Sequence, residues 1–226
     1  MEAISDELLS MKLQEGAKLI YEKALVQAGE GNMSVRLPSR EEMLITPTYN
    51  KYYNLKKKDL VHMKFDGTVI NRSSKPSSEF LLHLDLYKAR PAANCVIHTH
   101  SPHATMMSVA RKRIPILLEE QVIFLGGSVD ISEFAVAHST EFSINAINGM
   151  GTKNGVLMAN HGTLVCGRTI EDAIKMAELV EKLAFIYTGA EQLGQVYDIK
   201  ETSCSRFFPD FEEKFSTHPE KVGKCE

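Results

Sequence analysis

The stretch NCVIHTHSPHAT, residues 94–105, places three histidines directly behind a short apolar run. In an extended strand, residues two positions apart point to the same side, so His98 and His100 project together. Two neutral imidazoles this close suit one divalent metal, and zinc accepts such nitrogens at about 2.0–2.1 Å. Two histidines at a strand end that simply meet water explain the same pattern equally well. His103 falls in the first turn of the following helix, where it caps or packs.

A second motif, MANHGTLVCG at residues 158–167, also places a histidine directly after an apolar run. Gly162 permits a sharp turn that directs the imidazole of His161 back across the edge of a sheet. If the strands that precede His98 and His161 are parallel neighbours, the three imidazoles converge on one point. Three protein ligands with one open position are the arrangement of a catalytic metal. The spacing therefore favours a metal site.

The segment Pro76-Ser77-Ser78-Glu79 opens a predicted helix, and a capping arrangement with an acidic first turn explains much of it. Serine hydroxyls and free backbone N–H groups at a helix start also form an anion site suited to phosphate. A partly desolvated glutamate beside them can act as a general base. Further amides and hydroxyls are available to an anion at Gly31, Asn32 and 46–48.

The remaining histidines give weaker signals. His83 lies four residues after Glu79 on one helical face, so it either orients that carboxylate or fills space. His62, His138 and His218 carry no pattern and are expected to be structural or surface residues.

These residues need elements that position them, and the apolar periodicity predicts both helices and strands. The expected helices span residues 5–27, 77–90, 101–112, 139–148 and 169–188. The expected strands span residues 33–37, 42–46, 60–65, 94–100 and 155–160. Interleaved strands and helices indicate an α/β or α+β sandwich, a sheet covered by helices, in a single domain over residues 1–226. The last 30 or so residues show no clear pattern.

The composition excludes several classes of protein. The chain has 226 residues, of which 43% are hydrophobic and 24% charged, and a net charge of −3, which argues against a nucleic-acid-binding surface. No segment has the ~18–20 consecutive apolar residues of a membrane span. The acidic start MEAISDELL is not expected to be a secretory signal. Four cysteines without C-x-x-C spacing favour a reduced, cytoplasmic protein.

Taken together, the motifs resemble those of the class II aldolase/adducin family, most closely its L-fuculose-1-phosphate aldolase branch. They follow one another in the family's order and cover roughly residues 10 to 190, which makes the set specific. The matching segments are GNMSVR (31–36), LITPT (44–48), PSSEFLLHLDLYKARP (76–91), CVIHTHSPHAT (95–105), ANHG (159–162) and EDAIKMAELVEKLA (171–184). The tail, residues 195–226, is not matched.

The resemblance implies an α/β/α three-layer sandwich with a central, mostly antiparallel sheet, assembled as a homotetramer with active sites at subunit interfaces. It implies that His98, His100 and His161 bind one divalent metal per subunit, usually Zn²⁺, while Mn²⁺, Co²⁺ and Fe²⁺ also accept histidine nitrogens. Glu79 matches the catalytic acid/base, which also approaches the metal when substrate is absent. Five residues match phosphate-contacting positions, namely Gly31, Asn32, Thr48, Ser77 and Ser78.

The implied reaction is cleavage of a short or deoxy ketose 1-phosphate, such as an L-fuculose-1-phosphate-like sugar or a 5-deoxy or methylthio pentulose 1-phosphate. Breaking the C3–C4 bond leaves negative charge that the metal stabilises as an enediolate, acting as a Lewis acid. Glu79 would then deliver a proton to C3, which yields dihydroxyacetone phosphate and an aldehyde. Phosphate binding far from the breaking bond supplies orientation.

Two positions depart from the fuculose-phosphate branch. Tyr49 stands where that branch usually has glycine after the TPT segment, and it either restricts the approach of the loop to phosphate or points outward. Glu120 falls where fuculose-phosphate aldolase has a proton-donating tyrosine. It is either a second acid/base acting on the C4 oxygen or a plain surface glutamate beside Glu119. A glutamate at this position is also similar to the pattern of methylthioribulose-1-phosphate dehydratase of the same superfamily. A dehydratase activity is therefore a second hypothesis.

Three further alternatives share this scaffold. A 4-epimerase usually has aspartate at the position of Glu79, which disfavours it. A sugar-acid decarboxylase needs a cation for the substrate carboxylate, and the sequence does not identify one. An adducin-like interaction module would lack the metal site, so the presence of Glu79 and the three histidines argues against it.

Overall fold

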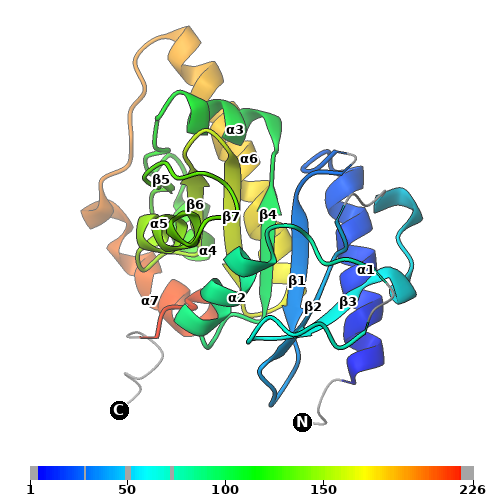
Figure 1. Ribbon diagram of the computed structural model, residues 1–226. Helices are drawn as coiled ribbons and strands as arrows, with labels where there is room; N and C mark the ends of the chain where they lie inside the picture. Colours follow the sequence, from blue (N-terminus) through cyan, green and yellow to red (C-terminus); the bar gives the residue numbers. More distant parts are fainter. Residues whose placement is uncertain (1–4, 28, 49–51, 72–73, 220–226) are drawn as a thin grey trace.

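A seven-stranded mixed sheet forms the centre of the computed structural model (Figure 1), which describes residues 5–27, 29–48, 52–71 and 74–219. The strand order is β3-β2-β1-β4-β7-β6-β5, and every neighbouring pair is antiparallel except β5 and β6. The mostly antiparallel sheet predicted from the resemblance is therefore confirmed. The strands are β1 Asn32–Arg36, β2 Glu42–Ile45, β3 Val61–Lys64, β4 Cys95–Thr99, β5 Asp130–Ile131, β6 Gly155–Met158 and β7 Gly162–Gly167.

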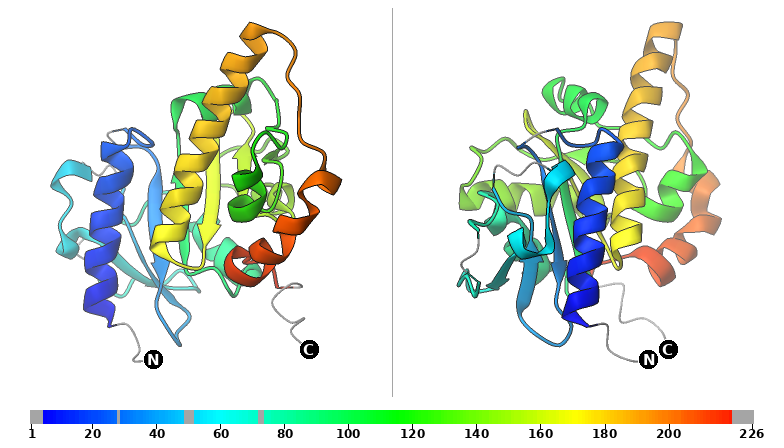
Figure 2. Two further views of the ribbon diagram at one scale, coloured as in Figure 1. Left: turned by 180° about the vertical axis from the view of Figure 1, so that it is seen from behind. Right: turned by 90° about the vertical axis from the view of Figure 1, so that its right-hand side faces the viewer.

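Helices cover both faces of the sheet, which gives the three predicted layers (Figure 2). Helices α1 and α6 lie on one face, with α3 packed on α6, while α2 and α5 lie on the other. Side chains alternate accordingly along β4, where Ile97 packs in the α1/α6 layer and Val96 in the α2/α5 layer. The helices are α1 Asp6–Glu22, α2 Phe80–Ala89, α3 Pro102–Val109, α4 Glu119–Leu125, α5 Thr140–Met150, α6 Ile170–Leu193 and α7 Phe208–Asp210.

The helix boundaries follow local capping, and two of them differ from the prediction. The Thr169 hydroxyl caps α6 by accepting from the Asp172 N–H at 3.0 Å, and the helix continues to Leu193, beyond its predicted end at residue 188. Helix α2 begins at Phe80, with Glu79 as the N-cap residue, so the prediction that Ser77 or Ser78 is the cap is wrong. The Ser77 hydroxyl instead accepts from the Glu79 N–H at 3.3 Å, in the turn before the helix.

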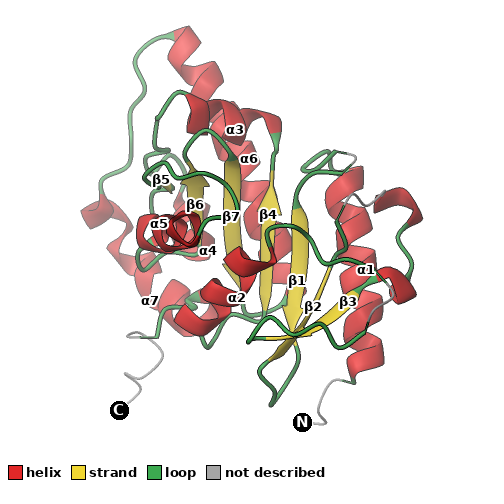
Figure 3. Cartoon of the chain, in the orientation of Figure 1, coloured by secondary structure: helices red, strands yellow, loops and turns green. Residues whose placement is uncertain are grey.

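The described part of the tail, residues 195–219, includes short helical turns packed against the body of the molecule (Figure 3). The side chain of Phe211 is buried against α4, and a Cβ on Gly126 would come within 2.5 Å of its ring. Arg168 donates to the carbonyls of Glu213 and Ser216, and Asn154 donates to the carbonyl of Phe215. These contacts join residues far apart in sequence, so local periodicity does not reveal them.

In the part of the chain that the structure describes, no helix combines the length and the apolar character needed to cross a bilayer.

Candidate metal centre and its cavity

His98 and His100 come from the end of the central strand β4. His98 is fully buried in the strand, and His100 follows directly after its last residue. As the alternation of a strand predicts, the two side chains lie on one side, with their Nε2 atoms 2.8 Å apart. The predicted pairing of these two imidazoles is therefore confirmed.

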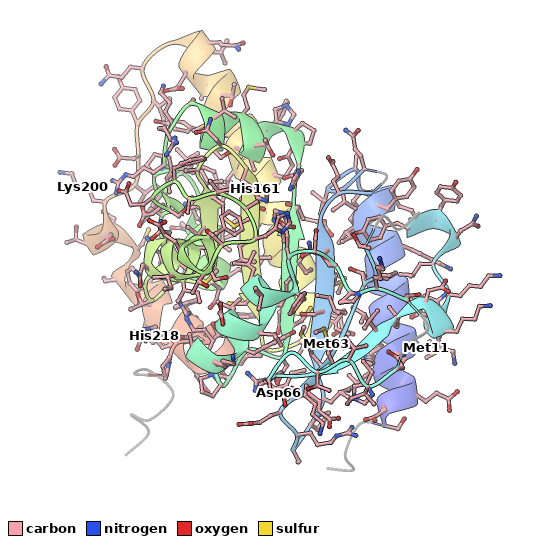
Figure 4. All side chains as sticks on the ribbon, in the orientation of Figure 1. Met11, Met63, Asp66, His161, Lys200 and His218 are labelled. Carbon is pink, nitrogen blue, oxygen red and sulfur yellow. The ribbon has the colours of Figure 1, made fainter. Side chains whose placement is uncertain are left out.

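His161 lies in the tight turn between β6 and β7, next to the end of β4 (Figure 4). Its ring centroid is 4.9 Å from that of His98 and 4.8 Å from that of His100. The premise that two parallel neighbouring strands bring the rings together is wrong, because β7 lies between β4 and β6 and is antiparallel to both. The chain reverses at Asn160, which adopts a left-handed φ of 54°, and this turn itself delivers the imidazole.

Gly162 is needed for close approach rather than for a special backbone conformation. A Cβ at this position would overlap the carbonyl oxygen of Thr99 and would lie 3.1 Å from the His100 ring and 3.2 Å from the His98 ring. The absence of a side chain therefore leaves the space into which the imidazoles gather.

The three histidines are placed to bind one metal ion, since their ligand atoms all lie within 4.8 Å of one another. The Nδ1 of His98 donates to the carbonyl of Thr163 at 2.8 Å, which directs its Nε2 toward the Nε2 of His100. The donor set therefore fits a divalent ion of the kind that histidine nitrogens bind.

The protonation of these rings is set by burial and by Glu79. Burial lowers the pKa of His98, but the negative charge of Glu79 and its hydrogen bond outweigh this effect, and the pKa lies above its usual value. Burial, together with the positive charges of His98 and His161, lowers the pKa of His100 to about 3. The three rings therefore do not ionise together, which keeps nitrogen lone pairs available.

Glu79 places both carboxylate oxygens on the histidine cluster. Its Oε1 lies 2.8 Å from Nε2 of His161, and its Oε2 lies 3.2 Å from Nε2 of His98. Burial raises the pKa of this carboxyl, but the positive charge of His98 and the hydrogen bonds from His161 and His98 outweigh burial and hold the pKa below its usual value. Glu79 is thus held ionised beside the site where a metal would bind.

A buried chain of hydrogen bonds fixes the orientation of this carboxylate. The Asn32 Nδ2 donates to Glu79 Oε2 at 2.8 Å, so its Oδ1 faces the opposite way and accepts from Nε2 of His83. The Nδ1 of His83 then accepts from the Ser34 hydroxyl at 2.7 Å, and Ser34 accepts from the Tyr87 hydroxyl at 2.8 Å. The reverse orientation of the amide would set its oxygen against a carboxylate.

His83 is therefore a positioning residue. The sequence left two roles open for it, orienting the carboxylate or filling space, and the structure shows that it orients Glu79 through Asn32. It is fully buried, and burial lowers its pKa to about 3, so it stays neutral and keeps one donor and one acceptor.

A cavity of about 210 Å³ opens beside the histidine cluster. All five predicted phosphate-contacting residues line it, together with Glu79, His100 and His161. Both polar ends of the buried Asn32 side chain are occupied by Glu79 and His83. None of the described residues that line the cavity is a lysine or arginine, and its polar lining consists of hydroxyls, amides, imidazoles and the carboxylates of Glu30 and Glu79.

Three lining residues were missed by reasoning from the sequence. Tyr52 donates its hydroxyl to the Gly31 carbonyl at 2.7 Å, and Glu30 places Oε2 at 3.7 Å from Nδ1 of His100. His138, predicted to be a structural or surface residue, also lines the cavity. Glu30 and His138 lie in loops and Tyr52 lies in a short 3-10 turn, where no periodicity marks them, and only the adjacency of Glu30 to the GNMSVR motif could have pointed to any of them.

One predicted residue, Glu120, is not brought to the cavity. Glu120 lies in the first turn of α4, where it is exposed and paired with Lys182 at 2.7 Å. Within one chain it does not line the cavity, and its role as an acid/base stays a prediction. Tyr49, the departure expected beside the phosphate site, lies outside the described residues. His103 pairs with Glu181 at 2.7 Å instead of joining the cluster.

Comparisons with known proteins agree with this geometry. The family model described as "Class II Aldolase and Adducin N-terminal domain" matches residues 11–188. A 5-deoxy-D-ribulose 1-phosphate aldolase of Bacillus thuringiensis is 30% identical, over 87% of this chain and 92% of its own length. A 5-methylthioribulose-1-phosphate/5-deoxyribulose-1-phosphate aldolase of Rhodospirillum rubrum is 30% identical, over 91% of this chain and 90% of its own. A solved L-fuculose 1-phosphate aldolase superposes with a TM-score of 0.87 and 28% identity, covering 93% and 98%.

Proposed function

Because the chain belongs to the class II aldolase and adducin family, we propose that it is a metal-dependent aldolase that cleaves a short or deoxy ketose 1-phosphate. The products are dihydroxyacetone phosphate and an aldehyde. One observation carries the proposal: Glu79 and three histidines placed for a metal lie at the cavity that the predicted phosphate-contacting residues also line.

The chain's own residues have distinct tasks in this reaction. His98, His100 and His161 hold the divalent ion, which supplies Lewis-acid stabilisation of the negative charge released when the C3–C4 bond breaks. Glu79 delivers a proton to C3 in cleavage and removes it in the reverse reaction. The hydroxyls and amides of the predicted phosphate contacts hold the phosphate and so orient the sugar. No lysine has to form a Schiff base.

The names of the relatives support a deoxy or methylthio pentulose 1-phosphate as the substrate. Both curated relatives described above are named for 5-deoxyribulose 1-phosphate, and one is also named for 5-methylthioribulose 1-phosphate. A dehydratase would use Glu120 as a second acid/base, and within one chain this residue is paired with Lys182 outside the cavity. The relatives described above are both named as aldolases, which supports the aldolase over the dehydratase.

We further propose Zn²⁺ as the metal and a cytoplasmic homotetramer as the assembly. Three imidazoles with an open position suit catalytic zinc. Exposed apolar side chains on α3, α5 and α6 give candidate contact surfaces, among them Met106, Val109, Ile144 and Phe185. Cys95, Cys166 and Cys204 are buried free thiols, as expected in a reducing compartment. Native mass spectrometry of the metal-loaded protein measures both the subunit number and the bound ion.

Product analysis tests the reaction. The protein is incubated with dihydroxyacetone phosphate and a panel of aldehydes, with and without added zinc or manganese, and the products are identified. We expect consumption of dihydroxyacetone phosphate only in the presence of metal. Glu79→Gln should lower turnover by about 10²–10⁴-fold, because a general acid–base group contributes that much.

The matched control is Glu178→Gln, which removes a half-buried carboxylate that pairs with Lys23 and does not line the cavity. It should keep full activity. Unchanged turnover in Glu79→Gln with normal metal content would show that Glu79 is not the acid/base. Activity that survives complete metal removal would exclude the proposed mechanism.

A further inference from the structure

We propose that His138 is a phosphate-binding residue of this site and sets its preference for phosphorylated substrates. The inference rests on the proposed sugar phosphate substrate and adds a contact beyond the predicted ones. His138 lies in the loop between β5 and α5, directly before Ser139, which caps α5. Its ring lines the same cavity as Thr48, Ser77 and Ser78.

The hydrogen bond of the His138 ring directs its other nitrogen to a ligand. Its Nδ1 donates to the carbonyl of Ser78 at 3.0 Å, because a carbonyl oxygen can only accept. This bond ties the ring to the serine pair predicted to contact phosphate. The Nε2 atom has no hydrogen-bond partner among the described residues, and when protonated it donates to an anion.

The cavity is negatively charged, so a phosphate group bound there needs a positively charged donor. Two carboxylates, Glu30 and Glu79, line the cavity, and no lysine or arginine does so among its described residues. A phosphate group brings further negative charge into the same space. His100 and His161 face the metal position, so His138 is the described imidazole in the lining that remains for the phosphate. An imidazolium donor to a phosphate oxygen is a charge-assisted hydrogen bond, which is stronger than a neutral one.

The backbone of His138 shows that the turn itself does not require a histidine. Its φ of 69° is in the left-handed region, which glycine adopts without steric cost. The side chain is exposed, and it packs in none of the clusters of the core. A purely structural role would therefore be filled as well by glycine or asparagine.

Binding of inorganic phosphate tests the inference without turnover. Full-length metal-loaded protein, His138→Asn and His138→Gly are titrated with inorganic phosphate by calorimetry, and kcat and KM are measured for the phosphorylated sugar. We expect the Kd for phosphate and the KM to rise about 10-fold in both variants, the loss of one charge-assisted hydrogen bond. The kcat should stay within about two-fold and the metal content unchanged. The unfolding temperature of His138→Gly should be equal or higher.

His62→Asn is the matched control, since His62 on β3 pairs with Glu42 on β2 and does not line the cavity. It should leave phosphate binding unchanged. An unchanged Kd for phosphate in both His138 variants would overturn the inference, and so would a fall in kcat with an unchanged KM. If no sugar phosphate is cleaved but phosphate binding depends on His138, the proposed reaction fails while the anion site stands.

Discussion

At the scale of single residues, the metal centre depends on an absent side chain as much as on the ligands. Gly162 lies against the Thr99 carbonyl and the rings of His98 and His100. Gly162→Ala should therefore push β4 and β7 apart, with a loss of about 2 kcal/mol or more in the free energy of unfolding. Metal affinity should fall at least 10-fold. Urea unfolding and a metal titration measure the two effects.

Gly189→Ala is the control for this substitution. Gly189 lies within α6, and a Cβ there would meet no atom within 4 Å. Alanine should stabilise the helix by about 0.5–1 kcal/mol and leave metal binding unchanged. Equal metal affinity in Gly162→Ala and the wild type would contradict the close-approach explanation.

The buried His83 predicts a specific dependence of stability on pH. Its pKa falls to about 3 in the folded protein, whereas an unfolded histidine titrates near its ordinary value of about 6.5. Between these two pKa values, His83 is protonated in the unfolded state but not in the folded state. Stability is unaffected above about pH 6.5 and should fall by about 1.4 kcal/mol per pH unit between that pH and about 3.

His83→Gln removes this contribution, so the difference in unfolding free energy between variant and wild type should shift in favour of the variant as the solution is acidified. Chemical denaturation at several pH values between 7 and 4.5 measures it. Parallel curves for the two proteins would show that His83 is not the group responsible.

At the scale of elements, helix α3 begins with a cap taken from another helix. Ser101 is the N-cap residue of α3, but its hydroxyl makes no capping hydrogen bond. The Glu181 carboxylate of α6 accepts from the N–H groups of His103 and Ala104 instead. Because His100 lies directly before this helix, Glu181→Ala should cost about 1–2 kcal/mol of stability and also weaken metal binding. Thermal unfolding and zinc titration, with Glu178→Ala as control, measure both.

The elements also show what a single sequence can predict. Local patterns gave β4, α6 and the helix after Pro76, and the alternation of a strand paired His98 with His100. The neighbours of β4 were predicted wrongly, because strand order depends on pairing between residues such as Thr99 and Thr163 that lie far apart in the chain. For the same reason the sequence did not predict the hydrogen bond from His138 to Ser78 or the series of hydrogen bonds from Tyr87 to Glu79.

At the scale of the whole molecule, the metal links distant segments of the chain, since His98 and His161 belong to different strand ends. An ion that binds only the folded state stabilises it by mass action, about 2.7 kcal/mol at a free concentration 100-fold above its Kd. Removing the metal with a chelator should therefore lower the unfolding temperature, and adding zinc back should restore it. Calorimetric scans at several free zinc concentrations check this, and a constant unfolding temperature would contradict the metal site.

The direction of the buried hydrogen bonds has a stereochemical consequence. Every donor from Tyr87 through Ser34, His83 and Asn32 runs toward Oε2 of Glu79, so this oxygen has no room for a proton of its own. The other oxygen, Oε1, is left to carry the hydrogen exchanged with the substrate carbon. In deuterated water, dihydroxyacetone phosphate should accordingly gain a single deuterium at C3, always on the same prochiral face.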